Sequence, residues 1–344
     1  MKPFMALLAT LLLLVGSTQL VLAGPVMGKG PDSGKQVKKI PDRKPMRCIG
    51  PVNMSNGMVL PTGKVTSSLK YVYVHKGDLY DGSDRMTGDY NGKYDRVNRV
   101  VKLTLKAGLF KNFDARVMAP FFEKEVKRKA GPKLDSYKDD VVGLGDIVVM
   151  GRYALMTQRS GDWFNLAIGA GLKIPTGDPN KENQAPFSAK HQYMGPGVQL
   201  GTGSWDPKFE LGATKFMGRS RVDAHCMLTL PGDGAHGSRK GTQLKYDLGY
   251  GYALNRSFDV ELEFNGVYQE AHIYDSDLTV NTGGTTLYIT PGVHWKIDDA
   301  WHLSLGVPVV FYRDLNGESA TPDSKSTYGI GEDFQVVARL GYCF

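Results

Sequence analysis

Apolar and polar residues alternate along most of the chain beyond residue 62. In the segment from Thr242 to Leu254, Leu or Tyr occupies every second position from 244 onwards, and Gln, Lys, Asp or Gly stands between most of them. The segment from Phe258 to Gln269 repeats this pattern with Asp and Glu at intervening positions. Because successive side chains of a β-strand point to opposite faces, a period of two predicts strands with one apolar and one polar face. Ten further runs bring the prediction to twelve strands, starting near Lys64, Val97, Phe113, Gly145, Asp162, Trp205, Arg221, Thr285, Trp301 and Asp333.

Short and long connections alternate between the predicted strands. The five short, polar turns lie around Lys111-Asn112, Arg159-Ser160-Gly161, Gly218-Arg219-Ser220, Asn255-Arg256-Ser257 and Asp298-Asp299. The six long links span approximately 76–96, 126–142, 175–204, 232–241, 272–284 and 312–332. Bacterial outer-membrane barrels combine short periplasmic turns, long outer loops and an even number of strands. The sequence therefore predicts an all-β protein, a twelve-stranded antiparallel transmembrane β-barrel over residues 63–344 with both termini in the periplasm.

Aromatic residues gather near the ends of the predicted strands, as in the aromatic girdles of membrane barrels. Trp163, Tyr250, Tyr252, Trp295, Trp301 and Tyr342 fall on the periplasmic side, and Trp205, Tyr268 and Phe311 fall on the other. The last strand ends with Tyr342 and Phe344 and looks like the C-terminal assembly signal of outer-membrane proteins, which implies contact with the outer-membrane assembly machinery. A secreted soluble sandwich also alternates with period two, but pure apolar faces opposite charged ones favour lipid outside and water inside.

The N-terminal region divides into a leader and a basic arm. Residues 1–23 join Lys2 to an apolar stretch and end at Ala23 in a small-residue site, which predicts a cleaved secretory signal peptide and supports location in the bacterial outer membrane. Residues 24–62 form a periplasmic arm rich in Gly, Pro and Lys. Residues 1–62 contain eight basic and two acidic residues, against 34 and 33 in the remainder. The basic pI therefore reflects the arm, and we expect no nucleic-acid partner.

Charged residues of both signs occupy the predicted inward faces. A barrel of eight strands has an interior filled by side chains, and one of sixteen to eighteen encloses an aqueous channel. Twelve strands lie between these limits, so we expect a narrow lumen partly filled by side chains. The predicted pore-lining residues are Lys102, Lys106, Arg116, Arg152, Lys173, Lys208, Glu210, Lys245, Asp247, Asp259, Glu261, Glu263, His294, Lys296 and Arg339.

One acidic patch on this wall can be placed more closely. A simple hairpin at Arg256 puts Glu261 opposite Gly251 and Glu263 opposite Gly249, so that two carboxylates lie beside positions without side chains. This arrangement is compatible with a shallow acidic recess that attracts cations or orients solutes. The interpretation we prefer is a solvated pore face on which glycines ease the curvature of the barrel.

The three cysteines allow one hypothesis about the arm. Cys226 shares the apolar face of its strand and is expected to pack as a small hydrophobic residue. Cys343 has inward parity at the periplasmic end, and Cys48 lies in the arm on the same side. A disulfide between Cys48 and Cys343 would hold the arm near the mouth of the lumen; the alternative is an arm that is free or contacts another periplasmic component.

The sequence offers no convincing catalytic, cofactor or metal site. The seven His residues are scattered, without zinc or haem spacing. One rival function is an outer-membrane lipid hydrolase, but the outward faces offer only Ser67 and His75, eight residues apart and hence about 26 Å along one strand. A second rival is a structural or surface-interaction barrel whose long loops bind partners.

Four short segments carry a family resemblance that covers roughly residues 60–344. They are GLGD (Gly143 to Asp146), LKIPTGD (Leu172 to Asp178), GTGSWDP (Gly201 to Pro207) and KFMG (Lys215 to Gly218). With these four segments in this order, the chain resembles the outer-membrane transporter family associated with the meta-cleavage pathway of phenol degradation. The resemblance implies passage of small, often aromatic molecules across the outer membrane. We therefore expect a passive, porin-like channel that contacts outer-membrane lipid and takes up small solutes, including aromatic or hydrophobic compounds.

Overall fold

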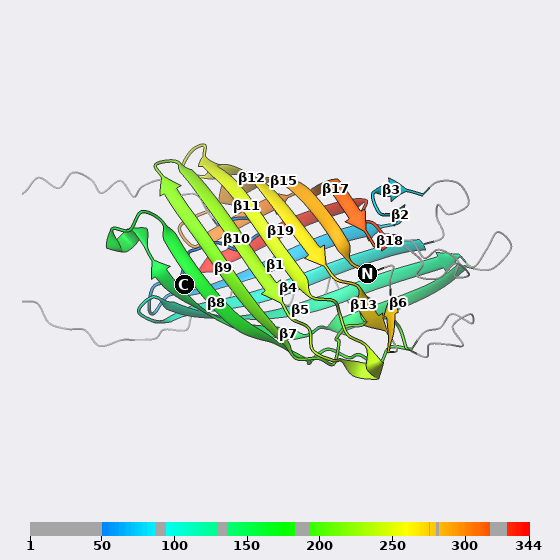
Figure 1. Ribbon diagram of the computed structural model, residues 1–344. Coiled ribbons are helices and arrows are strands. Elements are labelled where there is room, and N and C mark those ends of the chain that lie inside the picture. The colour runs from blue at the N-terminus through cyan, green and yellow to red at the C-terminus, as the bar shows by residue number, and fades with distance from the viewer. Residues whose placement is uncertain are drawn as a thin grey trace, which may run out of the picture. The chain divides into compact units, whose positions relative to one another are not determined.

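The described residues form a closed antiparallel barrel (Figure 1). The computed structural model describes residues 50–86, 94–129, 136–182, 193–274, 276–279, 282–316 and 329–344. The predicted signal peptide and the arm up to residue 49 lie outside these residues. Ten barrel strands are continuous: β1 (Val65–Lys76), β4 (Tyr94–Phe110), β5 (Phe113–Lys129), β8 (Asn165–Ile174), β9 (Asp206–Met217), β10 (Ser220–Thr229), β11 (Gln243–Ala253), β12 (Phe258–Gln269), β15 (Gly284–Lys296) and β19 (Phe334–Cys343).

Two further barrel strands are each broken into two pieces. One consists of β6 (Ser136–Leu144) and β7 (Ile147–Met156), the other of β16 (Trp301–Gly306) and β17 (Val309–Leu315). The second break falls at Pro308, which has no N–H to donate to a neighbouring strand. Neighbours in the chain pair with each other throughout, and β19 pairs with β1 to close the barrel. The twelve predicted strands are therefore confirmed.

The short connections match the predicted turns. Asn112 and Gly218 adopt positive φ angles of 61° in the turns after β4 and β9. The turn after β7 also ends on a positive φ, 97° at Gly161. In the two remaining turns the side chains of Asn255 and Asp298 each accept hydrogen bonds from two backbone N–H groups further along the turn. These Asx-type contacts explain why short polar sequences reverse the chain here.

The long links contain additional structure. Short strands β2 (Leu79–Asp81), β3 (Asp84–Arg85) and β18 (Gly329–Ile330) form one small sheet, and β13 (His272–Tyr274) pairs with β14 (Asp277–Thr279). One 3₁₀ turn, η3 (Ala235–Gly237), lies in a long link, and another, η2 (Gln158–Ser160), lies in the short turn after β7. Among the described residues, no helix is both long and apolar enough to cross a bilayer.

The predicted link at 126–142 is wrong in extent, because β5 and β6 continue through much of it as a paired ribbon. The ribbon is stabilised by ion pairs and by an apolar cluster in which Val126 and Val141 pack with Met194 and Val198. Glu125 lies 2.9 Å from Lys127 and 3.3 Å from Lys138, which in turn lies 3.1 Å from Asp140. The hydrophobic pattern alone does not reveal these strand extensions, since charged residues interrupt the apolar alternation.

The barrel is apolar outside and charged inside, the reverse of a soluble protein. Along β12, Phe258, Val260, Leu262 and Phe264 are exposed, whereas the intervening acidic residues are buried. At the ends of the strands, Trp163 is 77% exposed, and the Trp301 and Tyr342 rings lie 4.6 Å apart. An apolar outer band with aromatic residues at its rims is the surface of a barrel in the bacterial outer membrane, with the short turns in the periplasm.

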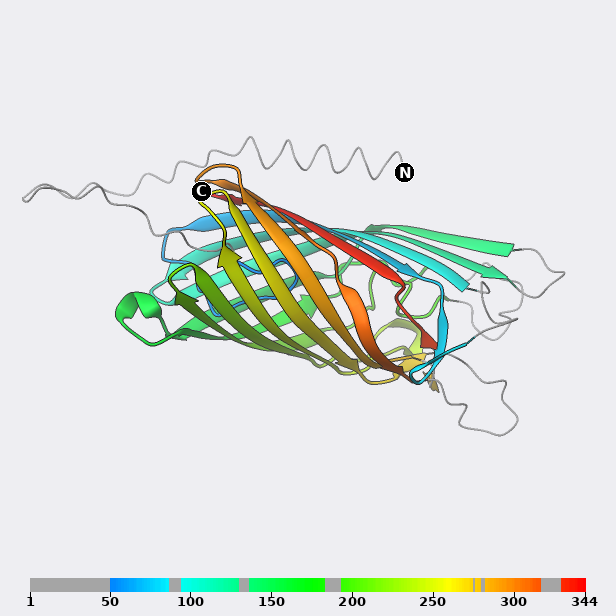
Figure 2. The same cartoon turned by 90° about the horizontal axis from the view of Figure 1, so that it is seen from above.

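Both ends of the barrel sequence lie at the short-turn end (Figure 2). Thr66 near the start of β1 is opposite Cys343 at the end of β19, and the N–H of Phe344 donates to the carbonyl of Val65 at 3.0 Å. The chain preceding β1 therefore enters the barrel from the periplasmic side.

Candidate functional site

Residues 50–62, called here the lumen segment, lie inside the barrel. The N–H of Leu60 donates a hydrogen bond to Asp114 Oδ2 on β5 (2.8 Å), and the N–H of Gly57 donates one to Thr214 Oγ1 on β9 (2.9 Å). Residues at the other end of the segment reach β12 and β19. The sequence had assigned residues 24–62 to a periplasmic arm; the structure differs for 50–62, which cross the bore and contact its wall on several sides.

Two wall arginines hold the segment by its carbonyl groups. Arg152 on β7 donates to Asn56 O at 3.0 Å and also to Met58 O, while its Nε and Nη2 bind Asp114 at 3.0 and 2.9 Å. Arg339 on β19 donates to the carbonyls of Pro51 and Gly50 at 2.5 and 2.7 Å. An extended segment without a strand partner must satisfy its backbone polar groups elsewhere. Here the charged side chains of the wall serve that purpose.

The acidic patch of β12 binds the same segment. The N–H of Val52 donates to Glu261 Oε1 at 2.7 Å, and the N–H of Asn53 donates to Glu263 Oε1 at 3.0 Å. Glu261 is also bound by Arg221 Nη2 at 2.9 Å. Both carboxylates therefore hold the lumen segment instead of facing an open recess.

The expected strand register at this patch is confirmed: Glu261 is opposite Gly251 and Glu263 opposite Gly249. A Cβ atom on Gly249 would lie 3.0 Å from Met54 Sδ, and one on Gly251 would lie 3.3 Å from the Arg221 guanidinium. The glycines thus leave room for Met54 of the lumen segment and for the arginine beside it. The recess that the sequence suggested is filled by the protein itself.

The predicted pore-lining residues fall into two groups. A cavity of about 1510 Å³ within the barrel is lined by Lys102, Lys106, Arg116, Lys208, Glu210, Lys245, Asp247, Lys296 and Arg339. The others are buried in contacts within the wall or with the lumen segment: Arg152, Lys173, Asp259, Glu261, Glu263 and His294.

Many of these charges are neutralised in pairs. Arg116 Nη2 lies 2.5 Å from Glu210 Oε2, and Lys296 Nζ lies 2.7 Å from Asp259 Oδ1. Lys173 lies between Asp146 and Asp206, at 2.9 and 3.0 Å. His294 Nε2 lies 2.9 Å from Glu261 Oε2. Paired charges keep the wall hydrophilic without giving it a strong net sign.

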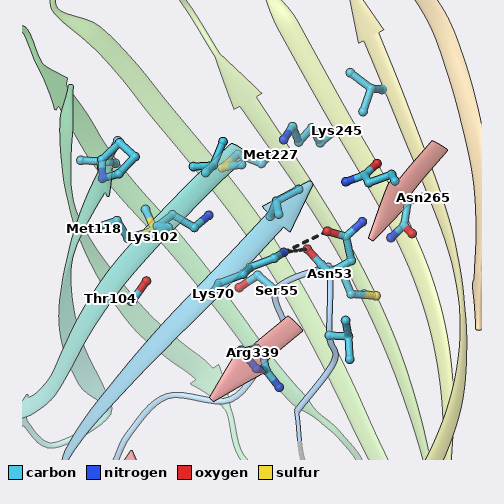
Figure 3. A pocket seen from close by; sticks show the side chains of 18 of the residues that line it. Asn53, Ser55, Lys70, Lys102, Thr104, Met118, Met227, Lys245, Asn265 and Arg339 are labelled. Carbon is cyan, nitrogen blue, oxygen red and sulfur yellow. Dashed lines mark hydrogen bonds between the residues drawn. The ribbon is translucent and has the colours of Figure 1, made fainter. Parts of the chain in front are cut away.

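Sequence reasoning missed Lys70, whose side chain points into the cavity from β1 (Figure 3). On the inward face of β1, Lys70 is followed by Val72 and Val74, so the strand carries apolar residues on both faces. The outward tyrosines Tyr71 and Tyr73 set the parity, and that signal could have placed Lys70 inside. The lumen segment itself was missed because it shows no periodic pattern.

The remaining candidate residues do not assemble into a catalytic or metal site. Ser67 is buried within β1, while His75 binds Asp95 at 3.0 Å and Asp333 at 2.9 Å. No group of His, Cys, Asp or Glu suited to a metal ion occurs in the described ranges.

The described cysteines bear on the disulfide hypothesis only in part. Among the described residues, no disulfide joins Cys226 to Cys343, and Cys343 lines the cavity. Cys48 lies outside the described residues, so the Cys48–Cys343 pairing stays a prediction.

Comparisons with known proteins agree with the fold. The chain is similar to the COG4313 outer membrane channel from Pseudomonas putida F1, with 15% identity, 86% of this chain and all of that chain covered, and a TM-score of 0.64. A Pseudomonas aeruginosa FadL homologue is similar at 10% identity, 82% and 91% coverage and a TM-score of 0.41. None of the curated proteins compared with the chain matches it.

The family comparison covers most of the barrel. The model of one family matches residues 86–318, which include ten complete barrel strands, β4 to β17 in the order of the chain. This match bears out the resemblance seen in the four short segments of the sequence. The chain therefore belongs to the family described as "Putative MetA-pathway of phenol degradation".

Proposed function

We propose that the protein is a passive outer-membrane channel for small solutes, whose width is limited by the lumen segment. The observation that carries this proposal is the extent of the cavity. Its lining includes His272, Thr282 and Gly284 near the long-loop end and Asp298 and Trp301 at the short-turn end. The cavity thus extends past the lumen segment along the length of the barrel, as a solute path requires.

The size and chemistry of the cavity favour small solutes over polymers. About 1510 Å³ is only somewhat larger than the pockets that enclose small organic molecules, roughly 300–1,000 Å³. The lining mixes paired charges with Val100, Met118 and Met227, so both polar and apolar groups of a solute find contacts. The family description suggests that aromatic compounds are among the solutes.

Liposome swelling tests this function directly. Protein reconstituted into liposomes is exposed to neutral solutes of increasing size, with protein-free liposomes as the control. We expect swelling with the smallest solutes and a steep decline as solute size grows. Absence of swelling with every solute, from protein whose gel mobility changes on boiling as folded barrels do, would contradict the proposal.

The rival functions predict other outcomes of parallel assays. A lipid hydrolase would release fatty acids from phospholipid in detergent, yet the buried Ser67 and the doubly ion-paired His75 are poorly placed for it. A surface-interaction barrel would lose partner binding when its long loops are shortened and would show no solute flux.

A further inference from the structure

Three cations stand side by side on the inner wall of the barrel. In the register of three adjacent strands, Lys102 of β4 is directly opposite Lys70 of β1, which is directly opposite Arg339 of β19. Like charges at directly opposed positions destabilise a sheet. Such a row is therefore costly unless other groups neutralise it.

The lumen segment accepts hydrogen bonds from two of these cations. Arg339 donates to the carbonyls of Gly50 and Pro51, and Lys70 Nζ donates to Asn53 Oδ1 at 2.9 Å (Figure 3). These acceptors are neutral. An amide oxygen satisfies a hydrogen bond of the ammonium group but leaves its charge uncompensated.

One lysine of this row and another near it have no hydrogen-bond or ion-pair partner among the described residues. Lys102 and Lys245 line the cavity, and neither makes a hydrogen bond or ion pair there. Lys245 comes from β11, across the bore from β1, and its charge is close enough to repel the ammonium groups of both Lys70 and Lys102. Figure 3 shows the three lysines around one part of the cavity.

Carboxylates of the wall do little to balance these lysines. Glu263 attracts Lys70 across space, but its carboxylate is bound by Asn53 and Asn265. Arg116 adds further repulsion on Lys102, although it is itself paired with Glu210. The site as it stands holds more positive than negative charge, which is the condition for binding an anion.

Apolar side chains surround the lysines. Val72 and Val100 lie opposite each other one pleat beyond Lys70 and Lys102, and Met118 lines the same side of the cavity. Across the bore, Met227 and Val267 are the strand neighbours of Lys245 on either side. A ligand here would meet charge at one end and apolar surface around the rest of its body.

We propose that Lys70, Lys102 and Lys245 form a binding site in the lumen for an amphiphilic organic monocarboxylate, with the carboxylate among the three ammonium groups and the apolar body against the valines and methionines. Charge-assisted hydrogen bonds from lysines are roughly twice as strong as neutral ones. This site adds a class of solute to the proposed channel function. It rests on that function only for the claim that the bound molecule is transported through the barrel.

The first test is binding, measured without any membrane. Benzoate is titrated into the detergent-solubilised full-length protein in a calorimeter, with benzyl alcohol as the neutral probe of similar shape. We expect saturable benzoate binding and much weaker binding of benzyl alcohol. Equal binding of both probes, or no binding of benzoate, would overturn the proposal.

Matched variants locate the site. Lys102→Gln with Lys245→Gln should weaken benzoate binding by roughly tenfold for each lysine. The control Lys64→Gln with Lys111→Gln removes the same charge from exposed positions outside the cavity and should bind like the wild type. Lys102→Arg with Lys245→Arg should retain most of the affinity. Unchanged binding in the glutamine variant would overturn the proposal; if that variant does not fold, Lys102→Gln alone is judged by the same criterion.

Transport separates this proposal from the proposed function. In planar bilayers, wild-type channels with benzoate as the only anion should show less preference for cations than the glutamine variant does. Conductance without benzoate binding would refute the site and leave the channel function standing. Benzoate binding by a protein that never conducts would refute the channel function and leave the site standing.

Discussion

Gly57 is one of the points at which the lumen segment packs closely against the barrel wall. A Cβ atom on this residue would lie 2.7 Å from Asn165 O and 2.8 Å from both Ala213 Cα and Gly212 O. All three atoms belong to the backbone of β8 and β9, which hydrogen bonds hold in the sheet. In the Gly57→Ala variant the lumen segment must therefore move away from the wall, since the backbone of β8 and β9 is fixed in the sheet.

The size of the effect follows from these contacts. The segment has to move by about 0.7 Å to bring the 2.7 Å contact to the ordinary 3.4 Å. Such overpacking costs about 1–3 kcal/mol. The shift also weakens the 2.9 Å hydrogen bond from Gly57 N–H to Thr214 Oγ1, a loss of about 0.5–1.5 kcal/mol. The free energy of releasing the segment should fall by about 1.5–4.5 kcal/mol, which is roughly a tenfold to thousandfold increase in its released population.

Hydrogen–deuterium exchange of peptides covering residues 50–62 measures this release. In the wild type, the N–H groups of Val52, Asn53, Gly57 and Leu60 are bonded to the wall and should exchange slowly. In Gly57→Ala they should exchange faster by the factor above, while the barrel strands stay protected.

The control for this experiment is Gly197→Ala, where a Cβ atom would have 3.8 Å to its nearest neighbour, Arg96. Exchange in the control should match the wild type. If Gly57→Ala also exchanged like the wild type, the segment would not be packed against β8 and β9 as described, and the reasoning would be refuted.

Three further changes have distinct expected outcomes. Arg152→Gln should lower the free energy of unfolding by about 3–5 kcal/mol in urea titrations, because Asp114, which is fully buried, loses its main partner. Lys127→Gln with Lys138→Gln should change that free energy by less than about 1 kcal/mol, because both side chains are about half exposed; a larger loss would contradict the weak role given to surface pairs. Burial and the nearby cations Lys240 and Arg96 lower the pKa of His272 to about 4 from 6.5, so the β13–β14 hairpin should lose stability as the pH falls from 6.5 towards 4, seen as lower protection factors there once the intrinsic pH dependence of amide exchange is divided out; equal protection factors at both pH values would contradict a neutral buried His272.

The barrel could be predicted from the sequence because its physics is local to each strand. Lipid outside and water inside impose opposite requirements on alternate residues. The residue pattern of a strand such as β12 therefore predicts both where the strand begins and ends and which side chains face outward. The tight turns add an independent signal, since Asn255 and Asp298 reverse the chain by contacts within a few residues.

The lumen segment could not be predicted in the same way. The bond from Val52 N–H to Glu261 joins residues 209 positions apart, and the segment has no repeating pattern that would indicate its partners. Its residues look like an unstructured arm because the groups that order it are carried by the wall. Lys70 could have been predicted, because the outward parity given to Ser67 and His75 already places it on the inward face of its strand.

The most direct measurement is single-channel conductance of the wild type and of a variant lacking residues 50–60, recorded in planar bilayers under the same salt conditions. A variant lacking residues 29–39, a deletion of equal length outside the lumen segment, serves as the control. The account predicts a small, stable conductance for the wild type and the control, and a clearly larger one without residues 50–60. Equal conductance in all three proteins, or none in any of them, would contradict a solute channel narrowed by its own N-terminal segment.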